Sequence, residues 1–174
     1  MSRTDYDLTR IKAFVFDVDG VLSPSTVPMD ADGVPRRMVN IKDGYAMQLA
    51  VKHGYLLAII TGADAPSIAT RYQALGITEV HLKASVKLPL LRDLLSRHDI
   101  SPDQVVYVGD DIPDIPCMKE VGLPVAPADA AVEVKEIARY ISPRDGGYGV
   151  ARDIIRQVMI TQGDWLDDRH AFGW

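Results

Sequence analysis

The sequence predicts an α/β fold, a Rossmann-like doubly wound parallel sheet with a β-hairpin insertion after strand 1 and no cap domain. Short apolar runs alternate with amphipathic segments along most of the chain, which is typical of βαβ units. Three of these runs end in Asp or Thr-Gly, as expected where open sheets bind ligands. With 174 residues, 47% of them hydrophobic, the chain fits one domain, 1–174. We expect its core at about 10–162 and a tail, 163–174, that is disordered or at an interface.

The first half of the chain predicts three strands, a hairpin and two helices. Residues 12–16 form an apolar, aromatic-rich run typical of a buried strand. Runs 27–29 and 34–39 flank an Asp-Gly turn and predict the hairpin. A helix is expected from Asp43 to about His53, with Gly54 as its stop signal. The remaining elements are strand Leu56–Ile60, helix 66–75 closed by Gly76, and strand 80–82.

Predicted helices and strands continue to alternate in the second half of the chain. Residues 86–98 place four leucines on one face and predict an amphipathic helix. We then expect strands Val105–Val108, 124–126 and Tyr140–Ile141, interleaved with helices 115–121 and 130–138. A glycine-rich loop, 146–149, precedes a last helix over 150–161, and the chain from Gln162 is expected to be irregular.

Composition narrows the class of partner. Nineteen basic and 24 acidic residues leave a net charge of −5, which argues against nucleic acid as the main partner. No basic run suggests a membrane patch, and neither a secretory leader nor a run of about 18 apolar residues occurs. The single cysteine, Cys117, cannot form an intramolecular disulfide. We expect a cytoplasmic protein with no membrane partner.

Two carboxylates, Asp17 and Asp19, lie directly behind the first strand. Held close together on a turn, they resist burial unless a cation or a proton lies between them. Thr61-Gly62 follows the second strand and Asp110-Asp111 the fourth, so all of them are expected at one edge of the sheet. Mg²⁺ is the natural counter-ion for such a group of carboxylates and a phosphate.

A cation, Lys87, stands at the start of a predicted helix, where a positive charge opposes the helix dipole. An anion in the site would account for its place there. Together with the Thr61 hydroxyl and nearby backbone N–H groups, Lys87 could hold a phosphoryl group. The set therefore indicates phosphoryl transfer, with an aspartate nucleophile, a second carboxylate as acid and base, a metal and an anion clamp.

These residues, in this order, resemble the four motifs of the haloacid dehalogenase superfamily. The resemblance implies that Asp17 is the nucleophile and Asp19 the general acid and base. It implies metal ligation by Asp17, the backbone carbonyl of Asp19, and Asp110. It further implies that Asp111 and Asp114 orient waters and Lys87 from a second layer. Phosphate binding would fall to Thr61, Gly62 and Lys87.

Within this superfamily the chain resembles the 3-deoxy-D-manno-octulosonate 8-phosphate phosphatase family, which has no cap. The likeness rests on residues 17–23, 40–45, 58–62, 107–111 and 146–149, and too few residues separate the motifs to form a cap. It implies a Mg²⁺-dependent phosphatase acting on a 2-keto-3-deoxy sugar acid phosphate, in the route to lipopolysaccharide. It also implies a homotetramer in which a neighbouring subunit completes each site.

One position departs from this family. Ala63 stands where the family usually has Arg, and a relative acting on a nine-carbon 2-keto sugar acid 9-phosphate has Glu there. Arg71 matches a family arginine expected near the substrate carboxylate, and the loop with Gly146 and Gly147 is a further expected substrate contact. The nine-carbon substrate therefore stays open beside the eight-carbon one.

Two functions from other classes compete with a phosphatase. Phosphoacceptor receiver domains also place acidic residues, Thr and Lys on a parallel sheet, but their acidic pair comes first, whereas Asp110-Asp111 follows Lys87. A non-catalytic assembly module, as in domains joined to sugar-nucleotide synthetases, would not need the acid and base Asp19. Both features favour the enzyme.

Overall fold

A six-stranded parallel sheet forms the centre of the molecule. The computed structural model describes residues 4–167 and 170–173. The strand order is β3-β2-β1-β4-β5-β6, and every neighbouring pair is parallel. The strands are β1 Ala13–Phe16, β2 Leu56–Ile60, β3 Glu79–His81, β4 Val105–Val108, β5 Leu123–Ala126 and β6 Tyr140–Ile141. The chain order reverses between β1 and β4, so the expected doubly wound α/β fold without a cap is confirmed.

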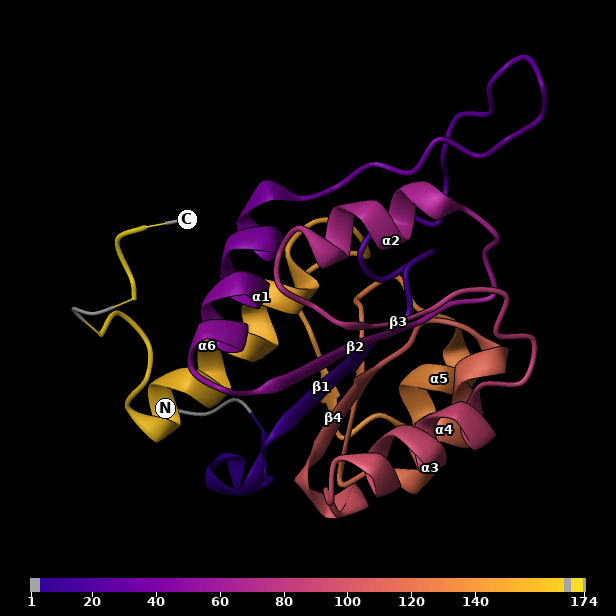
Figure 1. Cartoon of the computed structure of the whole chain (residues 1–174). Helices are drawn as coiled ribbons and strands as arrows, with labels where there is room; N and C mark the ends of the chain where they lie inside the picture. The colour runs from indigo at the N-terminus through magenta and orange to yellow at the C-terminus, as the bar shows by residue number, and fades with distance from the viewer. Residues whose placement is uncertain (1–3, 168–169, 174) are drawn as a thin grey trace.

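Helices cover both faces of this sheet. Figure 1 shows α1, α2 and α6 on one face, and α3, α4 and α5 on the other. Their bounds are α1 Ile41–Lys52, α2 Pro66–Gln73, α3 Lys87–Arg97, α4 Ile115–Glu120, α5 Val132–Ile137 and α6 Val150–Gln162. Short 3-10 turns are η1 Leu8–Arg10, η2 Pro102–Gln104 and η3 Ile112–Asp114. Among the residues described, no helix is long and apolar enough to cross a membrane.

The strand β1 is buried on both faces, which explains its unbroken apolar sequence. Because side chains alternate along a strand, Phe14 and Phe16 pack into the core beneath α1 and α6. Ala13 and Val15 face the other way, into the core that α3 and α4 cover. Burying a phenylalanine side chain contributes about 1.5–3 kcal/mol, so β1 is firmly anchored before it reaches Asp17.

The helix α1 begins two residues earlier than the sequence indicated, because Asn40 caps it. The Asn40 Oδ1 accepts hydrogen bonds from Lys42 N (2.9 Å) and Asp43 N (3.2 Å). Such a cap satisfies backbone N–H groups that have no partner within the helix. The Asp43 side chain is therefore not needed to cap α1.

Instead, Asp43 caps α6, a helix more than one hundred residues away in the chain. The residue before α6 is Gly149, which has no side chain to cap it. The Asp43 Oδ1 accepts a hydrogen bond from Arg152 N at 2.8 Å. Burial raises the pKa of Asp43 to about 6, against the hydrogen bond from Arg152 that lowers it. This contact ties α1 to the first turn of α6.

The hairpin is present, but the strands expected at 27–29 and 34–39 are wrong. A single antiparallel bridge joins Met29 and Pro35, and the excursion projects from the body of the molecule (Figure 1). The turn itself is closed by the Asp30 side chain, which accepts from Val34 N at 2.9 Å. Pro28 and Pro35 have no N–H to donate, so a longer ladder cannot form.

The described part of the tail lies against α1 and α6. The helix α6 runs to Gln162 and ends at Gly163, whose φ is +83°. Trp165 packs against the core, and the Tyr45 hydroxyl donates to the Ala171 carbonyl oxygen. Of the other two aromatic residues in the tail, Phe172 is exposed, and Trp174 lies outside the described residues. An interface role for this tail stays a prediction.

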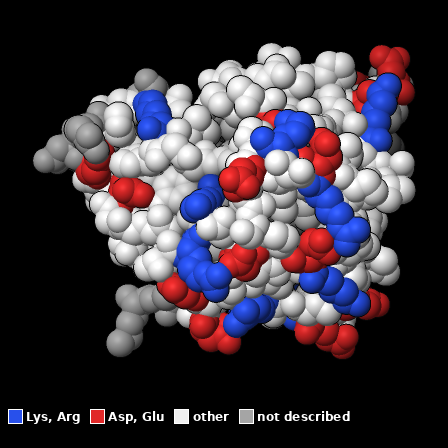
Figure 2. All heavy atoms as spheres, turned by 60° about the horizontal axis from the view of Figure 1, so that its bottom comes forward, with Lys and Arg blue, Asp and Glu red and all other residues white. Residues whose placement is uncertain are grey.

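The charged side chains on the face shown in Figure 2 are interspersed by sign. Several are paired across elements, as Arg92 is with Glu120 at 2.9 Å. Mixed charges of this kind are typical of a solvated surface.

Candidate active site

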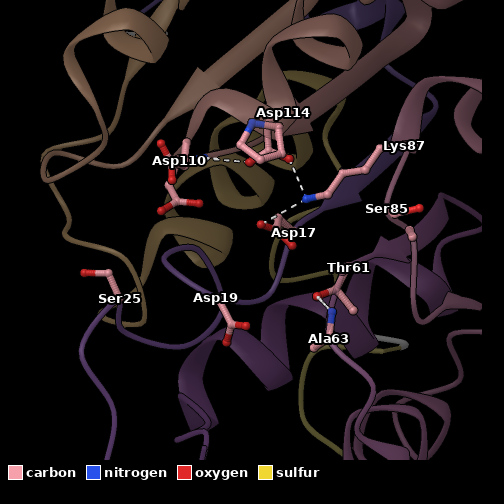
Figure 3. A pocket seen from close by; sticks show the side chains of 13 residues that line it. Asp17, Asp19, Ser25, Thr61, Ala63, Ser85, Lys87, Asp110 and Asp114 are labelled. Atoms are coloured by element: carbon pink, nitrogen blue, oxygen red, sulfur yellow. Dashed lines mark hydrogen bonds and ion pairs between the residues drawn. The ribbon is translucent and has the colours of Figure 1, made fainter.

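The carboxyl ends of β1, β2 and β4 border an open cavity of about 450 Å³. It contains most of the residues that the sequence singled out (Figure 3). The lining is Asp17, Asp19, Ser25, Thr61, Gly62, Ala63, Ala84, Ser85, Lys87, Asp110, Asp111, Pro113 and Asp114. Residues from four separate stretches of chain thus meet at one edge of the sheet, as predicted.

Three carboxylates crowd one side of this cavity. Asp17, Asp110 and Asp114 each offer an oxygen, and these oxygens lie within 4.8 Å of one another. Burial, with the neighbouring charge of Asp114, raises the pKa of Asp17 to about 6. Burial and the charges of Asp17 and Asp114 raise the pKa of Asp110 to about 8. Keeping these ionised groups close together therefore lowers the stability of the folded protein.

Lys87 is the cation that faces the three carboxylates. Its Nζ lies 2.7 Å from Asp114 Oδ1 and 3.1 Å from Asp17 Oδ2, and its side chain is only 5% exposed. Burial lowers the pKa of Lys87, but Asp17 and Asp114 more than offset this, so the pKa is raised and the lysine stays charged. The two ion pairs explain why a positive charge occupies the first residue of α3. The alternative lysine nearby, Lys83, is exposed and pairs with Asp64 at 2.9 Å.

Asp114 organises this group through three hydrogen bonds. Besides Lys87, it accepts from the buried Tyr107 hydroxyl at 2.8 Å and from Asp110 N at 3.1 Å. Its placement agrees with the expectation that it orients Lys87. Asp111 is exposed, and its Oδ1 accepts from Ile112 N at 2.8 Å at the start of η3. Tyr107 was not among the site residues predicted from the sequence; its signal is a single polar atom in an otherwise apolar strand.

The turn after β1 is shaped by Gly20 and by two glycines of the loop that packs behind it, Gly146 and Gly147. Gly20 has φ +79°, and a Cβ there would lie 1.9 Å from Asp110 Oδ2. A side chain at Gly146 would come within 2.0 Å of the Gly20 carbonyl oxygen. Gly147 N donates to Val21 O at 2.8 Å. Gly146 and Gly147 therefore support the back of this turn and are not among the residues that line the cavity of this chain, so the substrate contact expected for them stays a prediction.

On the opposite side of the cavity, Thr61 and Gly62 end β2. Thr61 is buried, and its Oγ1 accepts from Ala63 N at 3.2 Å. Gly62 is exposed and Ala63 presents only a methyl group to the cavity. A hydroxyl and an accessible backbone turn lie here across from Lys87, as an anion clamp requires.

Arg71 is not part of this chain's cavity lining. It lies on α2 and rests on α1, where a Cβ at Gly44 would be 2.5 Å from its Nη2. Its buried Nε has no hydrogen-bond partner among the described residues. The substrate contact expected for Arg71 is therefore not provided within this cavity.

The Asp19 side chain points away from the carboxylate group, as Figure 3 shows. It is 46% exposed and forms a two-pronged ion pair with Arg37, in which Nε lies 2.7 Å from Oδ1 and Nη2 lies 2.8 Å from Oδ2. Arg37 follows the hairpin, and nothing in its local sequence marked it as part of a site. The contact arises only because the hairpin returns beside the turn.

The donor set fits Mg²⁺. Carboxylate and carbonyl oxygens are the ligands this ion prefers, and three carboxylates with one lysine leave negative charge uncompensated. Asp17 and Asp110 offer side-chain oxygens, and Asp19 lines the same cavity. Among the described residues, this is the one group of three or more acidic, His or Cys side chains close enough to share an ion.

Comparisons with known proteins agree with this arrangement. A family model described as haloacid dehalogenase-like hydrolase matches residues 72–154. The chain is 39% identical over 153 residues to the 3-deoxy-D-manno-octulosonate 8-phosphate phosphatase of Escherichia coli, covering 88% of this chain and 81% of the relative.

Solved structures extend the likeness to three dimensions. The phosphatase of the same name from Yersinia pestis superimposes with a TM-score of 0.87 at 34% identity, over 90% of this chain and 85% of that one. The Moraxella catarrhalis phosphatase, solved with a magnesium ion, a phosphate ion and a KDO molecule, gives 0.86 at 28% identity, over 90% of each chain. This chain is similar in fold to both over 90% of its length.

Proposed function

The chain belongs to the 3-deoxy-D-manno-octulosonate 8-phosphate phosphatase family of the haloacid dehalogenase superfamily, and from this membership we propose its reaction. It is a Mg²⁺-dependent phosphatase that hydrolyses the phosphomonoester of a 2-keto-3-deoxy sugar acid, with 3-deoxy-D-manno-octulosonate 8-phosphate as the substrate. One observation carries the proposal: three clustered carboxylates, two of them paired with the buried Lys87, lie with Thr61 in an open cavity at the sheet edge.

Asp17 is the nucleophile in this proposal. Its carboxylate oxygen forms a bond to phosphorus while the bond from phosphorus to the sugar oxygen breaks. Lys87 contacts Asp17 at 3.1 Å, which favours the ionised carboxylate and aims it at the cavity. Asp17, the Asp19 carbonyl and Asp110 would hold Mg²⁺, which would supply positive charge to offset the negative charge of the phosphoryl oxygens.

Asp19 acts as acid and then as base. Its carboxyl donates a proton to the departing sugar oxygen, and its carboxylate then takes a proton from the water that attacks the aspartyl-phosphate. The attack releases inorganic phosphate and restores Asp17. The Thr61 hydroxyl and the Gly62 N–H bind the phosphoryl oxygens on the side opposite Lys87, and Asp114 keeps Lys87 in place.

We also propose that the active enzyme is a homotetramer. The segment from the hairpin to α1 exposes apolar side chains, with Met29 70% and Ile41 67% exposed. Contiguous exposed apolar residues are typical of an interface. The open cavity and the position of Arg71 outside it further support a site that a neighbouring subunit completes. Light scattering on the full chain tests this, and a monomer at working concentration would contradict it. The cytoplasmic location stays a prediction.

The activity is tested with a panel of phosphorylated sugar acids. We expect kcat/KM to be highest for the eight-carbon 2-keto sugar acid, with the nine-carbon acid and ordinary hexose phosphates as competitors. Activity should disappear with chelator and return with Mg²⁺, and Asp17→Asn should reduce kcat by about 10⁴-fold or more. A tenfold preference for a hexose phosphate would contradict the substrate assignment, and chelator-resistant activity would contradict the mechanism.

A further inference from the structure

A second cavity, of about 860 Å³, lies where α1 and α6 begin. The two helices pack against each other (Figure 1), and the residues that precede them, Asn40 and Gly149, both line this cavity. Helix N-termini carry partial positive charge, so the backbone makes the potential here more positive. Four basic side chains also line the cavity, which we call the basic groove: Lys42, Arg144, Arg152 and Arg156.

Three of these cations have no carboxylate to neutralise them. Lys42, Arg144 and Arg156 are exposed, and none of them forms an ion pair with another described residue. Arginines elsewhere on the surface are paired, as Arg92 is with Glu120 at 2.9 Å. In a protein with a net charge of −5, unpaired positive charge gathered in one groove indicates an anionic ligand.

The other two charged residues of the basic groove already have partners in the fold. Asp153, the one acid among the described lining residues, accepts hydrogen bonds from the Tyr140 hydroxyl at 2.6 Å and the Ser142 hydroxyl at 2.8 Å. The guanidinium of Arg152 packs on an aromatic ring, with its Cζ 5.2 Å from the centroid of Trp165. Asp153 is therefore engaged beside β6 and does not pair with the three exposed cations.

An exposed aromatic ring lies in the same groove. Tyr148 is 60% exposed, and the neighbouring apolar lining residues Met38 and Val39 are exposed as well. Nucleobases stack on aromatic side chains, because every base has a flat π-face. Arginine forks, in turn, bind phosphate oxygens through paired, charge-assisted hydrogen bonds. A molecule that joins a base to several phosphates would use both parts of the lining.

The basic groove is separate from the active-site cavity. The two share no lining residue, and the turn after β1 lies between them. Gly147, which lines the groove, donates from its N–H to Val21 O at 2.8 Å, and Met38 N donates to Ser23 Oγ at 3.2 Å. The groove lining therefore supports this turn from outside the cavity. A ligand in the groove leaves the cavity free for the substrate.

We propose that the basic groove binds a nucleoside triphosphate as a second ligand, distinct from the substrate. Lys42, Arg144 and Arg156 bind the polyphosphate, and the base stacks on Tyr148. The several negative charges of a triphosphate match the unpaired cations, which a neutral sugar or a monoanion would leave largely uncompensated. This inference goes beyond the proposed function and does not depend on it, because it concerns other residues.

The test is isothermal titration calorimetry on the full chain. Wild-type protein is titrated with ATP, GTP, CTP and UTP in turn, at a constant concentration of free Mg²⁺. The double variant Arg144→Gln with Arg156→Gln should raise the Kd of the tightest nucleotide by about 30-fold or more, because two charge-assisted contacts are lost. Thermal melting checks that the variants fold, and the single variants are used if the double variant does not.

Arg92→Gln is the matched control. Arg92 is an exposed arginine on α3, on the other face of the sheet, so its replacement makes the same change of charge away from the groove. It should change the Kd by no more than about twofold, since distant surface charges are screened by salt. A similar rise of the Kd in the control and in the double variant would overturn the site.

Tyr148→Ala tests the contact with the base. In wild-type protein we expect the tightest nucleotide to bind about tenfold more tightly than inorganic triphosphate, which has no base. This difference should disappear in Tyr148→Ala and persist in Tyr148→Phe, which keeps the ring. If inorganic triphosphate binds wild-type protein as tightly as every nucleotide does, the assignment of a nucleoside is overturned.

The active-site cavity is tested separately, through hydrolysis of p-nitrophenyl phosphate at constant free Mg²⁺. Nucleotide inhibition should not be competitive with this substrate, because the groove and the cavity share no residue. Competitive inhibition that persists in the double variant would mean that the nucleotide binds in the cavity, which overturns the proposal. Absence of any hydrolysis would contradict the proposed function, while the calorimetry would still decide the groove.

Two further results would overturn the proposal. The first is that no nucleotide binds wild-type protein with a Kd below about 1 mM. The second is that the double variant changes the oligomeric state measured by light scattering, while nucleotide does not bind wild-type protein. The basic groove would then be occupied by a second copy of this chain.

Discussion

Two clusters of charged side chains in this molecule are built from similar residues and have opposite balances. In the cavity, Asp17, Asp110 and Asp114 lie close together, and the one cation in the lining, Lys87, pairs with Asp17 and Asp114. At the outer edge of the sheet, Glu79 on β3 is shared by several basic groups. Arg97 Nη1 and His98 Nε2 lie 2.7 and 2.8 Å from its Oε1, and His81 Nε2 lies 2.9 Å from its Oε2.

The pKa values of the acidic residues in the two clusters differ in the same way as the charge balance. The pKa of Asp110 is raised to about 8 by burial and by its acidic neighbours. The pKa of Glu79 is lowered to about 2, chiefly by its hydrogen bonds with Arg97. The Glu79 cluster is neutralised by its own residues and needs no ligand, whereas the cavity cluster needs added positive charge. A candidate binding site therefore differs from a structural ion-pair cluster in the net charge of its side chains, more than in how many charged side chains it contains.

The largest effect is expected from Asp110→Asn, which removes one carboxylate from the cavity. Activity should fall by about 100-fold or more, because metal-supplied charge stabilisation contributes several kcal/mol. Mg²⁺ should raise the melting temperature of wild-type protein and no longer do so in the variant, since a ligand that binds only the folded state stabilises it. Thermal melting with and without Mg²⁺, together with kcat, measures both. An unchanged Mg²⁺-induced shift in Asp110→Asn would refute the metal site.

An effect of similar size, on stability, is expected from Lys87→Met, which leaves Asp17 and Asp114 without their cation. Breaking a buried ion pair by removing one partner costs about 3–5 kcal/mol in the free energy of unfolding. Mg²⁺ should restore part of this loss. Urea unfolding with and without Mg²⁺ measures it, with Lys83→Met as the control.

The Lys83→Met control tests whether the loss of stability is specific to Lys87. Lys83 has a side chain that is 69% exposed and pairs with an exposed carboxylate. Its removal should change the free energy of unfolding by no more than about 0.5 kcal/mol. A similar loss in both variants would contradict the assignment of the buried role to Lys87.

The smallest effect is expected from Glu79→Gln, in the self-neutralised cluster. Because the folded-state pKa of Glu79 lies at about 2, below its ordinary value of 4.5, its ion pairs stabilise the protein above pH 4.5. The contribution is lost as the pH falls toward 2. We expect wild-type protein to be more stable than the variant by about 1 kcal/mol at pH 7, and by much less near pH 3.

Urea unfolding at the two pH values measures this difference. The kcat of Glu79→Gln should equal that of wild-type protein, because Glu79 does not line the cavity. A fall in kcat comparable to that of Asp110→Asn would mean that the two clusters are not distinct in the way their charge balance indicates.

Much of the candidate site could be predicted because its signals are local. An apolar run that ends in a carboxylate predicts both the strand and the edge at which the carboxylate emerges, so Asp17, Thr61 and Asp110 were placed correctly. Helix ends follow similar local rules. The hairpin turn was predicted on its Asp-Gly signal, but its strands were wrong, because two prolines remove backbone donors.

The sequence by itself determined the parallel α/β fold, the edge at which the site forms and the kinds of atoms that meet there. Only the tertiary structure decided how those atoms are paired: Arg37 with Asp19, Tyr107 with Asp114, and Asp43 with the start of α6. It also placed Gly146 behind the turn and Arg71 outside the cavity. Periodicity and end signals report a residue's own strand or helix, whereas these contacts depend on where other elements pack, which no local pattern records.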